Sequence, residues 1–130
     1  MLNRDYNTRD KFLFHGYNED AYMGGIRRIR CLTSEDIKYL LDLRFIDPMD
    51  CQNDSPSVKE IYDFLKEHSE FYAFGYAVSP KRDDYRISIE GICSNWESIN
   101  IPKEDLIDFV DFSVGADELS ITPYCRAWWD

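Results

Sequence analysis

The sequence predicts an α+β domain with two layers, in which about four strands form a mainly antiparallel sheet and three helices pack on one face. Apolar residues alternate with period two on both sides of a turn between Phe71 and Ile92, which predicts a β-hairpin. Two helical patterns follow each other directly before this hairpin, so the chain lacks the strand–helix alternation of a parallel sheet. Arg86, Ser88 and Glu90 give the hairpin a polar face, whereas a parallel sheet would be buried on both faces.

The predicted hairpin reads FYAFGYAVS, then the turn PKRDD, then YRISIEGI. The register that gathers the large apolar side chains on one face places Val78 opposite Tyr85, Tyr76 opposite Ile87, and Phe74 opposite Ile89. We expect the helices to cover that face. The other face is small and polar, and we expect it to be open to solvent or to a partner: Ala73, Gly75, Ala77, Arg86, Ser88 and Glu90.

Capping signals predict where the helices begin. Thr33 and Asp36 have the spacing of a capping box, and Pro48 ends the helix that follows. Two more helices are predicted, one from the N-cap Ser55 to about His68 and one from about residues 100–102 to Phe112.

The other segments are assigned from alternation and turn residues. Strands are predicted over residues 12–15, 26–32 and 118–122, the first two at sheet edges. The polar segment 1–11 is expected to be flexible, and the tail 124–130 is expected to place at least one tryptophan against the body of the protein. The 130 residues contain no internal repeat and no interior linker, which predicts a single domain over 1–130.

The charge of the chain bears on its partners and its compartment. The formal net charge is −10, with eight Lys/Arg against seven Asp/Glu in residues 1–45 and seven against eighteen in residues 46–130. Such a charge opposes nonspecific binding to nucleic acid or to an anionic membrane, and we expect neither as a partner. The four cysteines have no zinc-site spacing, and no secretory pattern is found at the N-terminus. We therefore expect reduced thiols and a cytoplasmic location.

The sequence contains no motif that indicates a catalytic residue, a metal site or a cofactor. The two histidines, His15 and His68, suggest no local triad, and the best enzymatic alternative is Cys51 as a nucleophile near a helix N-terminus with a histidine base. Four loop residues offer oxygen ligands without the glycine and alternate spacing of a calcium loop: Asp47, Asp50, Asn53 and Asp54. Capping and a solvated turn are the favoured interpretation of that loop. Catalysis is left open, and binding is favoured over it.

Two groups of residues are candidates for binding. Arg28 and Arg30 point to one side of a strand and could form a fork for a carboxylate or a phosphate, although pairing with the protein's own acids is the favoured alternative. The candidates for contact with a partner are an acidic helix stripe and the aromatic tail, namely Glu104, Asp108, Asp111, Trp128 and Trp129, with Trp96 and Tyr124 as further aromatics.

The first hypothesis for function is a small acidic protein that binds another macromolecule, in particular a basic protein, without catalysis. The second is a binding protein or enzyme for an anionic small molecule, with a pocket between the sheet and the helices that contains Arg28 and Arg30. A homodimer formed through an edge strand is a third hypothesis.

Overall fold

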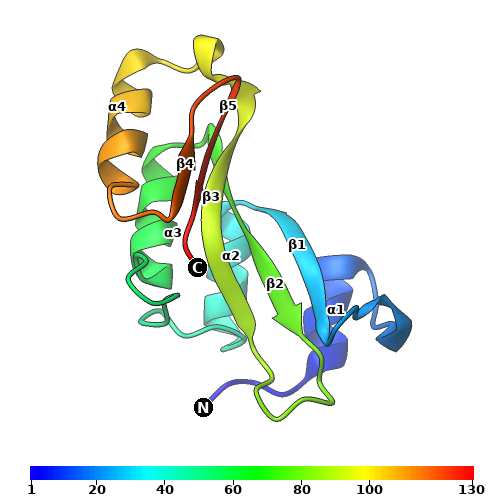
Figure 1. Cartoon of the computed structure of the whole chain (residues 1–130). Coiled ribbons are helices and arrows are strands. Elements are labelled where there is room, and N and C mark those ends of the chain that lie inside the picture. Colours follow the sequence, from blue (N-terminus) through cyan, green and yellow to red (C-terminus); the bar gives the residue numbers. More distant parts are fainter.

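The structure, a computed structural model that describes residues 1–130, is an α+β fold in two layers. Five antiparallel strands form one sheet in the order β1-β2-β3-β5-β4, and helices α2 and α3 pass behind it in the view of Figure 1. The elements in chain order are α1 (Tyr6–Phe14), the short 3-10 helix η1 (Glu19–Ala21), β1 (Ile26–Leu32), α2 (Ser34–Asp42), α3 (Val58–Glu67), β2 (Phe71–Val78), β3 (Ile87–Glu97), the short 3-10 helix η2 (Ser98–Asn100), α4 (Lys103–Phe112), β4 (Glu118–Ser120) and β5 (Tyr124–Trp128). The predicted class and layout are confirmed, with one more strand and one more α-helix than expected.

Side-chain caps begin helices α2 and α3. Thr33 and Asp36 form the predicted capping box of α2, in which each side chain accepts a hydrogen bond from the backbone amide of the other. The N-cap of α3 is Ser57, which forms a capping box with Glu60, and not the predicted Ser55. The hydroxyl of Ser55 instead accepts a hydrogen bond from the amide of Gln52 within the preceding loop.

Helix α1 differs from the sequence prediction for the N-terminal segment. The residues expected to form a flexible segment over 1–11 and an edge strand over 12–15 contribute instead to one helix, Tyr6–Phe14. Its fully buried side chains are Arg9 and Asp10, and none of its apolar side chains is fully buried. A helix that docks through charged residues has no apolar stripe, so the hydrophobic period does not reveal it.

The Arg9–Asp10 pair attaches α1 to the sheet. Arg9 Nε lies 2.8 Å from Asp10 Oδ1, and the Arg9 guanidinium also donates to the Tyr22 hydroxyl and the Val78 carbonyl. The Tyr22 hydroxyl in turn donates to Asp10. The same guanidinium packs 4.5 Å from the centre of the Tyr85 ring. Each buried charge thus has a partner, which a buried ion pair requires.

The β2–β3 hairpin is present, but its register differs by one residue from the predicted one. Ala77 stands opposite Ile87, and Tyr76 stands opposite Ser88. Glu90 is an extra residue at a β-bulge, beyond which Phe74 stands opposite Gly91. The predicted faces are therefore exchanged for β2, because the small residues face the helices and Tyr72, Phe74 and Tyr76 face the opposite side.

The close approach of β3 explains this exchange. An added Cβ at Gly75 would lie 1.9 Å from the carbonyl oxygen of Ser88, so no side chain fits there. Ala73 and Ala77, both fully buried, leave room under the helices for the large side chains of β3. Ile87 and Ile89 lie on the helix face as predicted, and Ile92 joins them beyond the bulge, where it stands opposite Ala73. Tyrosine on the other face keeps its hydroxyl near polar partners.

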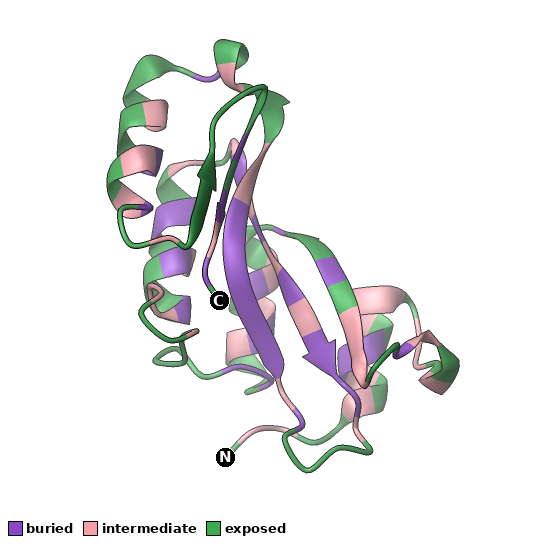
Figure 2. Cartoon of the chain, viewed as in Figure 1, coloured by how far each residue is buried: buried purple, intermediate pink, exposed green.

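The core lies between the sheet and the helices. Figure 2 shows its buried residues along β3 and on the helix surfaces that face the sheet. Phe71 of β2 and Phe109 of α4 stack with ring centroids 4.9 Å apart. The segment expected as a tail is strand β5, which pairs with both β3 and β4. No helix has the length and apolar character needed to cross a bilayer.

Candidate functional site

One face of the sheet is turned away from the helices, and we call it the open face (Figure 1). Strand pairing places these side chains on it: Arg28, Arg30, Tyr72, Phe74, Tyr76, Arg86, Ser88, Glu90, Cys93, Glu118, Arg126 and Trp128. The sequence predicts that one face is open, but its alternation places the small side chains of β2 on that face. The open face instead has four partly exposed aromatic rings.

Three of the predicted site residues meet on the open face. Arg28, Arg30 and Trp128 line a shallow groove of about 510 Å³, together with Phe74 and Arg126. The sequence predicts a pocket between the sheet and the helices that contains both arginines. Strand pairing places Arg28 opposite Tyr76 on the open face, and both arginines also line a smaller groove between β1 and the helices α1 and α2. The sequence does not place Trp128 beside the arginines, because it predicts a tail over 124–130 and not the strand β5.

Glu90 and Arg28 form an ion pair at the floor of the groove. The Glu90 side chain is 8% exposed, whereas the Arg28 side chain is 64% exposed. Glu90 faces the open side as Ser88 does, and Arg28 compensates the carboxylate that is buried there. Arg30 is exposed and forms no ion pair with a carboxylate, so its guanidinium is free to bind a ligand.

Phe74 lies flat across the middle of the open face. Its ring covers Gly91, and an added Cβ there would lie 2.2 Å from Phe74 Cζ. The guanidinium of Arg126 stands 4.8 Å from the centre of the same ring, which is a cation–π contact. Arg126 also approaches Glu118 of β4, with 3.6 Å between Nη1 and Oε2.

Tyr76 and Arg86 form a polar network at the other end of the open face. Arg86 donates to the Tyr76 hydroxyl at 3.3 Å, to the Ser88 hydroxyl at 3.0 Å, and to Asp84. Burial by itself would raise the pKa of Tyr76, but hydrogen bonds with Ser88, Gln52 and Arg86 outweigh it, so the pKa is lowered. This network fixes the orientation of one ring and one guanidinium.

The open face differs in charge from the rest of the chain. It has four arginines, two glutamates and no lysine, whereas the whole chain has a net charge of −10. Arginine and aromatic residues are enriched in the cores of protein–protein interfaces, and lysine and glutamate are depleted there.

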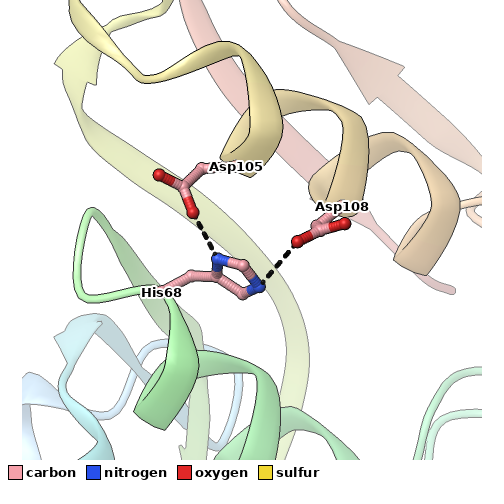
Figure 3. Close-up of side chains that lie close together, drawn as sticks. All are labelled: His68, Asp105 and Asp108. Carbon is pink, nitrogen blue, oxygen red and sulfur yellow. Dashed lines mark hydrogen bonds and ion pairs between the residues drawn. The ribbon is translucent and has the colours of Figure 1, made fainter.

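The acidic stripe of α4 lies apart from the open face. Glu104 and Asp111 are exposed, and Asp108 turns towards His68, which ends α3. Figure 3 shows the His68 ring between two carboxylates of α4, Asp105 and Asp108. His68 Nδ1 lies 2.7 Å from Asp105 Oδ1, and Nε2 lies 3.4 Å from Asp108 Oδ2. The sequence does not predict this contact, because no local pattern relates residues on different helices.

These three residues are the one group of His, Cys, Asp and Glu side chains close enough together to hold a metal ion. Each ring nitrogen of His68 faces a different carboxylate (Figure 3). The arrangement therefore fits a link between α3 and α4 better than a metal centre, which would need several ligands directed at one point.

The remaining predicted residues do not assemble into a site. Trp129 is buried against Phe112, with ring centroids 6.3 Å apart, so Trp128 is the tail tryptophan that a ligand can reach. Cys51 is exposed, and its thiol has a contact with the Asn53 carbonyl and none with a histidine. Asp47 accepts a hydrogen bond from the Met49 amide, as expected of a turn. Trp96 and Tyr124 are about half exposed at the far end of β3 and β5.

A larger hollow of about 740 Å³ lies at the other end of the molecule, between the N-terminal residues, the loop after α2 and the start of β3. The charged side chains that line it near β3 are Asp84 and Arg86, which pair with each other. It contains none of the residues that the sequence analysis selected for binding.

The fold and the open face together define a two-layer α+β protein with a sheet surface rich in arginine and aromatic residues. No family model matches the chain, and the comparisons with curated proteins and with solved structures found no match.

Proposed function

We propose that this chain is a protein-binding module without catalytic activity, and that its open face binds an acidic segment of a partner protein. The observation that supports the proposal is the combination of four arginines and four aromatic rings on one face that no helix covers. Tryptophan, tyrosine and arginine are the residues that most often dominate the free energy of protein–protein binding.

The charges of the groove favour an acidic partner. Arg28 and Arg126 each have one carboxylate nearby, whereas Arg30 has none. A partner that brings carboxylates to the groove would complete the pairing of these guanidinium groups, which bind carboxylates in a bidentate manner. A basic partner on Glu104 and Asp111 is a weaker proposal, because the third residue of that stripe, Asp108, is engaged by His68.

Peptide display tests the proposal, because a random peptide library requires no prior choice of a partner protein. A library of 12-residue peptides is selected on the protein and sequenced, and enrichment of acidic peptides with aromatic or aliphatic residues is expected. Binding of the enriched peptides should weaken about tenfold in the double variant Arg30→Ser and Arg126→Ser, because two exposed guanidinium groups are lost. It should also weaken as the salt concentration rises.

The matched control is the double variant Glu104→Ser and Asp111→Ser, which changes two exposed charges on α4 and should leave binding unchanged. Enrichment of basic peptides that depend on this pair would overturn the proposal in favour of the acidic helix. A rise in melting temperature with citrate or phosphate, together with no peptide enrichment, would favour the small-anion alternative.

A further inference from the structure

Strand β1 has an unpaired edge that continues the open face. It is the first strand in the sheet order, so one side pairs with β2 and the other side pairs with no strand. Along this edge runs a groove of about 360 Å³ between β1 and α1. Backbone N–H and C=O groups at such an edge can pair with an added strand.

The two sides of this edge differ in chemistry. On the helix side, α1 contributes three partly buried apolar side chains to the groove: Phe12, Leu13 and Phe14. Arg28 and Arg30 line this groove too, and they also line the groove of the open face on the other side of the edge. The acid that lines the groove, Asp36, is already engaged in the capping box of α2.

The two faces of an added strand would lie in these two different environments. Because successive side chains of a strand point to opposite faces, one set would reach the arginines and the other set would reach the apolar groove. The complementary segment therefore alternates acidic and apolar residues. A segment of about five to seven residues matches the length of β1, which spans seven residues.

A second copy of the same strand fits this edge poorly. β1 reads IRRIRCL, with three arginines and no acid. Antiparallel pairing of two β1 strands would bring arginines of the two copies close together on a sheet face, and like charges opposite each other are destabilising. The charge of β1 thus opposes a homodimer through this edge and selects an acidic strand.

We propose that an extended segment of a partner protein, with acidic and apolar residues in alternation, adds to β1 as a sixth strand. This inference rests on the proposed function, and it specifies how the acidic segment binds. Its acidic side chains pair with Arg28 and Arg30, its apolar side chains enter the groove beside α1, and its backbone pairs with the free edge of β1.

A fluorescein-labelled peptide with five Glu-Val repeats serves as the probe, and fluorescence anisotropy measures its binding to the full chain. A peptide of the same composition with the five glutamates in one block should bind at least about tenfold more weakly. N-methylation of alternate amides should weaken binding at least about tenfold for one parity and less than about twofold for the other, because only every second residue pairs with β1. Arg30→Gln should weaken binding about fivefold, whereas the matched charge change Lys103→Gln on α4 should not.

Equal effects of the two N-methylated series would overturn strand addition. If the display-selected peptides still depend on Arg30 and Arg126 in that case, the proposed function stands and only the inference fails. If no acidic peptide binds at millimolar concentration, both fail. Tighter binding of a dT12 oligonucleotide than of the peptide would assign this edge to a nucleic acid. A dimer in sedimentation whose population changes with Arg30→Gln would assign the edge to a second copy of the chain. Either outcome would also overturn the inference.

Discussion

The ring of Phe74 occupies the space that a side chain at Gly91 would need. An added Cβ would lie 2.2 Å from Phe74 Cζ and 2.3 Å from the carbonyl oxygen of Ala127. The glycine therefore lets the ring lie flat on the sheet, where Arg126 stacks above it. We expect Gly91→Ala to lower the free energy of unfolding by about 1–3 kcal/mol, since a well-packed site must shift to accept a methyl group. Urea unfolding measures the change.

Gly115→Ala is the control for this substitution. The nearest atom to an added Cβ at Gly115 is Trp129 Nε1 at 4.0 Å, an ordinary contact distance, so the free energy of unfolding should change by less than about 0.5 kcal/mol. Equal losses in the two variants would show that the effect of Gly91→Ala comes from the loss of a glycine and not from the position of Phe74.

A second prediction concerns the buried pair that holds α1. Asp10→Asn leaves the guanidinium of Arg9, which is 0% exposed, without a charged partner. We expect a loss of about 3–5 kcal/mol in the free energy of unfolding, because an uncompensated charge is then buried. Tyr22→Phe removes a hydrogen-bonding hydroxyl without removing a charge, so it should cost about 1–3 kcal/mol. A larger loss for Tyr22→Phe than for Asp10→Asn would contradict this account.

The hairpin shows what the sequence could and could not predict. Alternation locates both strands, and Ile87 and Ile89 of β3 do face the helices as predicted. Alternation alone does not determine which face of β2 is buried, because that choice depends on the bulge at Glu90 and on the approach of the Ser88 carbonyl to Gly75. These are contacts between strands, and the period-two pattern of apolar residues in the sequence does not reveal them.

The candidate site, like the hairpin, could be predicted only in part from the sequence. The direction of Arg28 and Arg30 to one side of a strand follows from the pleat, and so does the separation of Trp128 from Trp129. The meeting of Arg28 with Trp128 depends on the strand order, which places β5 between β3 and β4. Local sequence does not indicate that order.

A third prediction concerns the link between α3 and α4. Asp105 lies 2.7 Å from the His68 ring and is 22% exposed, whereas Asp108 lies 3.4 Å from it and is 55% exposed. Asp105→Asn should therefore cost about 1–2 kcal/mol in the free energy of unfolding, and Asp108→Asn less than about 0.5 kcal/mol, since an exposed ion pair contributes little. Urea unfolding at pH 6 measures both. Similar losses for the two variants would contradict the unequal roles of these carboxylates.

A fourth prediction is a loss of stability at alkaline pH. Burial raises the pKa of the Cys93 thiol to about 11, and it also raises the pKa of Tyr22, which a hydrogen bond to Asp10 raises further. In the unfolded chain these groups titrate near their ordinary pKa values, 9.0 for cysteine and 10.0 for tyrosine. The unfolded chain therefore releases its protons first as the pH rises, and the free energy of unfolding falls from about pH 9 upwards.

Urea midpoints between pH 7 and pH 11 measure this dependence. Cys93→Ser removes one of the groups, so its midpoint should fall less steeply between pH 9 and pH 11 than that of the unaltered protein. The exposed Cys51 provides the matched control, because Cys51→Ser should leave the slope unchanged. The thiols also differ in reactivity: iodoacetamide at pH 8 should alkylate Cys51 well before Cys93, since burial keeps the Cys93 thiol protonated. Alkylation of both thiols at one rate would show that Cys93 is not buried in its neutral form.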